Sequence, residues 1–162
     1  KNIYTNVLKG HIAVAHADLN KKKTGKLIDI EARKFLKKKN MDYAHGTGHG
    51  VGYFLNVHEG PQAISKNNKV KIQNGMILSN EPGYYKKDKF GIRIENLVYA
   101  NKIQGKLFFK NLTLAPLEKD LINHKLLTKK EENYIFRYHL EIYSKLSPFL
   151  NKKEKKWLAK LI

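Results

Sequence analysis

The spacing of apolar residues divides the chain into a helical first part, a middle part of short strands and a helical last part. Apolar side chains recur at helical intervals over residues 1–17, and Thr24-Gly25 interrupts that pattern. A second helix is expected over Leu27–Lys39, with lysines near its C-terminus, where cations suit the helix dipole. We expect it to end at Asn40. The side chains expected to face the core are Leu27, Ile30, Ala32, Phe35 and Leu36.

The middle part, from Tyr43 to about Asn101, has short β-type runs separated by glycines and by Asn/Lys turns. The clearest strands are predicted at Ile77–Ser79 and Ile92–Tyr99. A further strand is predicted at Leu107–Leu114. This part of the chain is therefore expected to form a sheet.

The last part of the chain is predicted to be helical again after Pro116. Thr128 and Glu131 have capping-box spacing at the start of an amphipathic helix, and Ser147-Pro148 is expected to end that helix. A last short helix is expected over residues 151–162. The order of helices, strands and helices predicts an α+β fold with two domains, residues 1–115 and residues 116–162.

Composition excludes several classes of protein. The 162 residues contain no cysteine, which rules out a disulfide framework, a thiolate zinc site and a cysteine nucleophile, and which suits a cytoplasmic protein. No apolar run has the length of a membrane span. The net charge of +18 invites a nucleic-acid-binding hypothesis, but 29 of the 32 basic residues are lysines scattered along the chain. We therefore interpret the charge as a solvated surface and expect no specific nucleic-acid partner.

The strongest chemical signal is the run from His45 to Pro61, which reads HGTGHGVGYFLNVHEGP. It holds three histidines, His45, His49 and His58, among five glycines. Imidazoles are common metal ligands and acid–base groups, and glycines let the backbone approach a ligand closely. The glycines make a helix implausible here, so a looped or extended segment is expected.

Two further segments each place one carboxylate in a short strand-like stretch, Glu81 in the first and Glu95 in the second. An imidazole with carboxylates is a ligand set suited to divalent Mn, Co or Zn. Arg93 and Glu95 are expected to point to the same sheet face because strand side chains alternate. Each feature alone has a structural explanation, such as a turn or an ion pair. Together they favour a metal-dependent hydrolase site.

These motifs resemble those of the Xaa-Pro aminopeptidases (aminopeptidase P) in the pita-bread metallopeptidase family. The resemblance extends over nearly the whole chain and implies an α+β pita-bread catalytic domain, present in part, with a C-terminal helical extension. The segments that carry it are His49–Gly52, Val57–Pro61, Ser79–Tyr85 and Phe90–Asn96.

The resemblance implies roles for the candidate residues. His49 and Glu81 would bind one metal ion, and Glu95 would bridge two. The family binds two divalent ions, and we expect Mn, with Zn or Co as alternatives. His45 and His58 would line the substrate pocket and assist proton transfer.

Arg93 is the third catalytic candidate and would orient the site, again by resemblance. The two remaining metal ligands of the family are aspartates on a hairpin before the first helix. Asp18 and Asp29 have the wrong neighbours to replace them. We therefore expect the sequence to be part of a longer enzyme, and the isolated chain to be inactive.

The implied partner is a peptide with proline in second position, and a homodimer is also expected. Two alternatives remain open at this point. A prolidase would cut Xaa-Pro dipeptides on the same scaffold, and a non-catalytic pita-bread module would only bind. Non-catalytic relatives typically lose metal ligands, whereas His49, Glu81 and Glu95 are all present.

Overall fold

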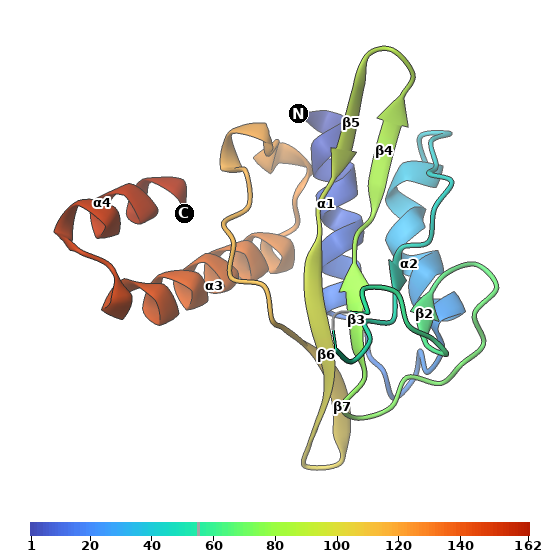
Figure 1. The fold of residues 1–162 in the computed structure, drawn as a ribbon. Helices are drawn as coiled ribbons and strands as arrows, with labels where there is room; N and C mark the ends of the chain where they lie inside the picture. Colours follow the sequence, from blue (N-terminus) through green and yellow to red (C-terminus); the bar gives the residue numbers. More distant parts are fainter. Residues whose placement is uncertain (55) are drawn as a thin grey trace. The chain divides into compact units, whose positions relative to one another are not determined.

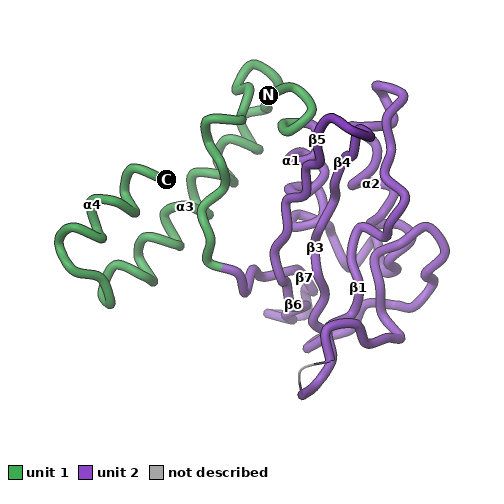
Figure 2. Tube along the Cα trace, turned by 45° about the horizontal axis from the view of Figure 1, so that its top comes forward, with its two compact units in different colours: residues 1–5, 114–162 green, residues 6–113 purple. Residues whose placement is uncertain are grey.

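The computed structural model describes residues 1–54 and 56–162. Leu55, which belongs to the run from His45 to Pro61, lies outside the described residues. The chain forms two compact units, which are described separately: the larger holds residues 6–113, and the smaller holds residues 1–5 and 114–162 (Figure 2).

Two helices precede the strands in the chain, α1 (Asn2–Ala15) and α2 (Gly25–Lys37). α2 begins two residues before its predicted start, because Thr24 adopts an extended conformation at the N-cap. The core-facing prediction for this helix was partly wrong, since Leu27 and Ile30 are 42% and 53% exposed. The buried stripe is instead formed by Ile28, Asp29, Ala32, Arg33 and Leu36, two of which are charged.

In the part of the chain that the structure describes, seven strands form three antiparallel sheets, with the orders β1-β2, β3-β6-β7 and β4-β5. The long hairpin of β6 and β7, and the facing pair β4 and β5, are visible in Figure 1. The strands are β1 (Gly48–His49), β2 (Ala63–Ile64), β3 (Ile77–Asn80), β4 (Gly83–Lys86), β5 (Phe90–Arg93), β6 (Asn96–Ile103) and β7 (Lys106–Asn111).

The prediction of one continuous strand over Ile92–Tyr99 was wrong. β5 ends at Arg93 and pairs with β4, whereas β6 begins at Asn96 and pairs with β3. The partner strand is interrupted at the same level, between β3 and β4. The interruption there contains Pro82, which has no backbone N–H to donate to a ladder.

The core of the larger unit joins the two helices to the strands. Val14 of α1 and Ile28 and Ala32 of α2 are buried there, at most 1% exposed. The strand and loop residues of this core are Ala17, Leu19, Ile64, Ile72, Leu78, Val98, Ala100 and Phe109. This packing fixes β3 and β6, whose ends carry the candidate site.

The smaller unit contains two helices, α3 (Lys129–Leu146) and α4 (Lys152–Leu161). The predicted capping box is confirmed, since the Thr128 and Glu131 side chains each bond the other's backbone N–H. Three 3₁₀ turns complete the unit: Lys119–Leu121, His124–Leu126 and Ser147–Phe149. Within the described part of the chain, no helix is long and apolar enough to cross a membrane.

Candidate metal centre

The two candidate carboxylates face each other because of strand register. Asn80 pairs with Asn96 at the end of one ladder, and Gly83 pairs with Arg93 at the start of the next. Two residues separate these pairs on each strand, so the register continues across the break and Glu81 lies opposite Glu95. Residues opposite each other in an antiparallel pair have neighbouring side chains. The change of pairing partner thus places both carboxylates at one point.

His49 reaches the same point from β1. An isolated bridge between Gly50 and Leu78 holds this segment against β3, and the His49 amide donates to the Ser79 hydroxyl at 2.9 Å. Gly48 permits the close approach, because a Cβ at this position would lie 2.0 Å from the Ser79 carbonyl oxygen. The glycine before His49 therefore has a steric role.

His49, Glu81 and Glu95 form a group of potential metal ligands. One ligand atom from each lies within 4.8 Å of those of the other two. His49 Nε2 is 3.3 Å from Glu81 Oε1. Glu81 is buried, His49 is partly buried and Glu95 is exposed, so the group opens to solvent on one side.

Hydrogen bonds orient the histidine and the buried carboxylate. His49 Nδ1 lies 2.9 Å from the Gly50 carbonyl oxygen, which can only accept, so we assign the proton to Nδ1. The other ring nitrogen, Nε2, then faces Glu81. The Ser79 hydroxyl donates to Glu81 Oε1 at 2.8 Å. Bonds of this kind fix the orientation of metal ligands, so the donor set fits a divalent cation.

Arg93 lies beside this group and contacts a tyrosine that had no role in the sequence prediction. Arg93 Nε is 3.6 Å from Glu81 Oε2 and donates to the Tyr85 hydroxyl at 2.9 Å. The Tyr85 hydroxyl is also 3.0 Å from His45 Nε2. Tyr85 thus links two predicted catalytic residues. The sequence could have indicated Tyr85, because residues four apart in an extended segment lie on the same face, and Tyr85 is four residues from Glu81.

His45 and His58 take different positions around the group. His45 Nδ1 donates to the Gly46 carbonyl oxygen at 2.7 Å, which leaves Nε2 to accept from Tyr85. The ring of His58, an exposed residue, lies 4.0 Å from the His49 ring, centroid to centroid. Both imidazoles therefore flank the ligand group without belonging to it.

Neither aspartate considered in the sequence joins the ligand group found among the described residues. Asp29 is 1% exposed, and its two oxygens accept from Arg33 and Thr47. Asp18 accepts from the backbone and side chain of Asn20. Both carboxylates have structural partners.

His11 of α1 is a fully buried histidine close to the candidate site. Its Nδ1 donates to the Ile94 carbonyl oxygen at 3.2 Å, and its buried Nε2 is left without a hydrogen bond of good geometry among the described residues. The His11 carbonyl accepts from Asn80 at 3.0 Å. Burial lowers the pKa of His11 to about 4. This residue connects α1 to the neighbours of both Glu81 and Glu95.

Comparison with known protein families identifies the family to which the chain belongs. Metallopeptidase family M24 matches residues 1–102, and the C-terminal region of that family matches residues 105–161. The chain belongs to metallopeptidase family M24. Among curated relatives, it is 46% identical to Xaa-Pro aminopeptidase 1 of Dictyostelium discoideum over 98% of this chain. It is 44% identical to a probable Xaa-Pro aminopeptidase P of Coprinopsis cinerea over 97% of this chain.

Solved structures of the family share the fold. X-prolyl aminopeptidase from Caenorhabditis elegans, described as a cytosolic enzyme with a di-nuclear active site, superposes with a TM-score of 0.89 at 38% identity over 98% of this chain. Prolidase from Pyrococcus furiosus superposes with a TM-score of 0.59 at 33% identity over 68% of this chain. The predicted α+β pita-bread architecture is confirmed. The chain covers 27% of each of the two curated relatives, 28% of the C. elegans chain and 31% of the prolidase chain.

Proposed function

We propose that the protein containing this chain is a metal-dependent aminopeptidase that releases the N-terminal residue from Xaa-Pro peptides. The observation that carries the proposal is the convergence of His49, Glu81 and Glu95 within 4.8 Å. Similarity to Xaa-Pro aminopeptidases over nearly all of this chain supports the substrate class.

In this proposal, His49 and Glu81 would hold one divalent cation, and Glu95 would help to hold both. Bound divalent ions would polarise the scissile carbonyl and lower the pKa of water. The exposure of Glu95 and the partial exposure of His49 leave this side accessible to a peptide. We propose Mn²⁺ as the native metal, with Zn²⁺ or Co²⁺ as alternatives, because the ligand set suits all three.

The neighbouring side chains supply proton transfer and orientation. His58 lies beside the His49 ring and is exposed, so it can give or take a proton at a bound peptide. His45 Nε2 accepts from Tyr85, which places a second imidazole on the other side of the site. Arg93 keeps a positive charge 3.6 Å from Glu81 Oε2, where it would orient this carboxylate.

The wider setting of the enzyme is also proposed. Within this chain, the enzyme's domains would be residues 1–115 and 116–162. We also propose that the enzyme acts in the cytoplasm, by similarity to the cytosolic X-prolyl aminopeptidase of C. elegans. A homodimer would cover apolar side chains of the smaller unit, where Phe136, Phe149 and Trp157 are each more than 60% exposed. The isolated 162-residue chain would be inactive, because three ligands are too few for two cations.

The experiment uses the full-length protein with Mn²⁺, an Xaa-Pro-Yaa tripeptide and an Xaa-Pro dipeptide. We expect chelator-sensitive release of the first residue from the tripeptide. Cleavage of the dipeptide alone would indicate a prolidase. Metal binding without cleavage of either peptide would indicate a non-catalytic module. A tripeptide with alanine in place of proline is the matched control and should be cleaved far more slowly.

A further inference from the structure

A buried arginine on α2 binds the segment that carries His45. The Arg33 side chain is 2% exposed, and its Nε donates to Asp29 Oδ2 at 2.8 Å. Nη1 donates to Asp42 Oδ1 and to the Tyr43 carbonyl oxygen, both at 2.7 Å. Nη2 donates to the carbonyl oxygen of His45 at 2.7 Å. One guanidinium therefore bonds to three successive points of this segment.

Asp29 ties the far end of the same segment to the helix. Its second oxygen, Oδ1, accepts from the Thr47 hydroxyl at 2.6 Å, and that hydroxyl bonds to the Tyr43 hydroxyl. The Arg33 guanidinium also lies over the Tyr43 ring, 3.9 Å from its centroid. Burial tends to lower the pKa of Arg33, but the bond to Asp29 opposes this, and the pKa is raised overall. The arginine is therefore charged at every physiological pH.

Residues 41–47 form no helix or strand, so no regular pattern of backbone hydrogen bonds holds this segment. The bonds to Arg33 and Asp29 therefore fix its conformation. Holding one residue in a single backbone conformation costs about 1–2 kcal/mol in entropy. Thr47 makes the connection to the site, because its carbonyl oxygen accepts from the Glu81 amide at 2.8 Å. The position of the His45 ring relative to Tyr85 therefore depends on this network.

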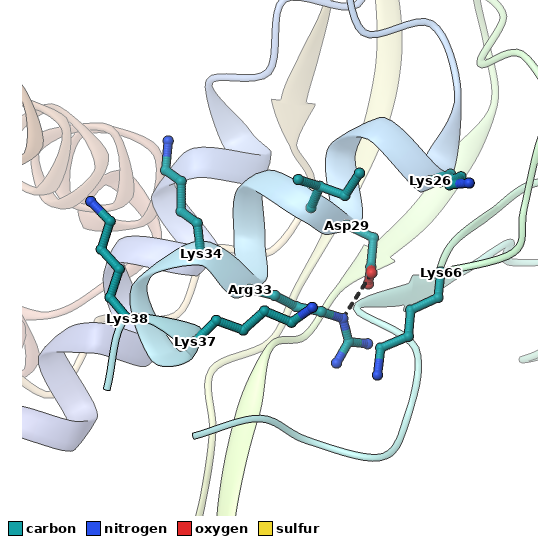
Figure 3. Close-up of a pocket in the computed structure, with 8 residues that line it drawn as sticks. Lys26, Asp29, Arg33, Lys34, Lys37, Lys38 and Lys66 are labelled. Carbon is teal, nitrogen blue, oxygen red and sulfur yellow. Dashed lines mark hydrogen bonds and ion pairs between the residues drawn. The ribbon is translucent and has the colours of Figure 1, made fainter. Parts of the chain in front are cut away.

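Arg33 also borders a cationic pocket of about 520 Å³ on the same face of α2. Figure 3 shows Arg33 and Asp29 joined by their ion pair, with lysine side chains around them. Besides Arg33 and Asp29, the pocket is lined mainly by lysines, among them Lys37. The exposed Lys37 offers a position for a control substitution, whereas Lys66 bonds to Asp42 of the network and does not.

We propose that Arg33, together with Asp29 and Thr47, is a positioning residue that sets the place of His45 in the site. Arg33 does not touch substrate in this proposal and acts through the His45 backbone. The inference rests on the proposed aminopeptidase function, in which His45 lines the substrate pocket. If the bonds from Arg33 to the Tyr43 and His45 carbonyl oxygens are lost, His45 should shift and turnover should fall. The metal ligands His49 and Glu81 should stay in place.

The test is a double-mutant cycle in the full-length protein with Arg33→Lys and His45→Ala. Lysine keeps a charge for Asp29, but it cannot reproduce the fork to the two carbonyl oxygens. We expect Arg33→Lys to lower kcat about 10- to 100-fold, as a displaced catalytic group does, with Mn²⁺ content unchanged. Because the effect passes through His45, Arg33→Lys should cost nothing further in the His45→Ala background. Additive losses would overturn the proposal.

A second readout, which does not depend on activity, is hydrogen exchange of residues 42–47 measured by mass spectrometry. Arg33→Lys should raise exchange in this segment and leave β3 unchanged, and the control Lys37→Ala should change neither. Equal exchange in the Arg33→Lys and native proteins would refute the positioning role. If the native protein cleaves no Xaa-Pro peptide, the proposed function fails, and the exchange result alone decides the positioning role.

If Arg33→Lys does not fold, Asp42→Asn replaces it in both measurements. Asp42 is 34% exposed and receives only one of the Arg33 bonds, so the fold should tolerate this change. We expect a smaller loss of kcat, again non-additive with His45→Ala. An additive loss, or unchanged exchange over residues 42–47, would overturn the proposal in this variant as well.

Discussion

Gly48→Ala is expected to separate the metal ligands without removing any of them. A Cβ at Gly48 would lie 2.0 Å from the Ser79 carbonyl oxygen and 2.9 Å from its carbonyl carbon. Real Cβ contacts are essentially never shorter than 3.0 Å, so β1 and β3 must separate by about 1.0 Å (3.0 − 2.0). Both neighbours are backbone atoms and cannot rotate away. The methyl group must therefore displace His49 from Glu81.

A displacement of that size matters because metal sites tolerate little change. Ligand distances in working sites stay within about 0.2 Å of their ideal values. We expect Gly48→Ala to weaken Mn²⁺ binding about 10- to 100-fold, as loss of an orienting contact does. Overpacking should also lower the free energy of unfolding by about 1–3 kcal/mol.

The assay is a Mn²⁺ titration of the full-length protein, with Xaa-Pro tripeptide cleavage measured in the same samples. Gly46→Ala is the matched control, because a Cβ there meets its nearest atoms at 3.5–3.6 Å, an ordinary contact distance. Native Mn²⁺ affinity in Gly48→Ala would refute the reasoning that the close approach of β1 to β3 sets the ligand geometry.

The further predictions concern five single side chains. His58→Ala should lower turnover about 100-fold or more with metal content near normal, whereas Glu95→Ala should lose metal and activity together; metal analysis with the tripeptide assay checks both. Tyr85→Phe removes the hydroxyl shared by His45 and Arg93, and should lower kcat more than it changes Mn²⁺ affinity in the same titration. Thr128→Ala should destabilise α3 by about 1 kcal/mol without changing kcat, as measured by hydrogen exchange along that helix. The pKa of His11 is about 4 in the folded protein, below the usual 6.5, so the unfolded chain binds more protons between these pH values. The free energy of unfolding should therefore fall by roughly 3 kcal/mol as the pH drops from 6.5 to 4. Urea unfolding should show this pH dependence in the native protein and not in His11→Gln.

The candidate site could be predicted from sequence because its residues lie in short motifs of unusual composition. The run from His45 to Pro61 and the isolated carboxylates Glu81 and Glu95 were recognisable without a structure. The sequence did not reveal how the carboxylates meet. That depends on a change of strand partner between Arg93 and Asn96, and alternation within one strand carries no information about which strand pairs with it.

The supporting residues were harder to predict for a different reason. Arg33 and Asp29 lie four residues apart on α2, a spacing that usually indicates an exposed ion pair. The helix face that carries this pair is buried, so Leu27 and Ile30 on another face are exposed to solvent. The apolar pattern had predicted both in the core. The pair is buried because it binds residues 41–47, which follow the helix and form no helix or strand. Apolar periodicity gives no information about such a segment.

We propose that His49, Glu81 and Glu95 hold the catalytic metal. Anomalous diffraction from crystals of the full-length protein grown with Mn²⁺ tests this directly. We expect two peaks, one within roughly 2.0–2.3 Å of His49 Nε2 and a Glu81 oxygen, with a Glu95 carboxylate shared between them. Peaks that lie away from these three side chains, or the absence of any peak near them in protein that cleaves Xaa-Pro peptides, would contradict the account.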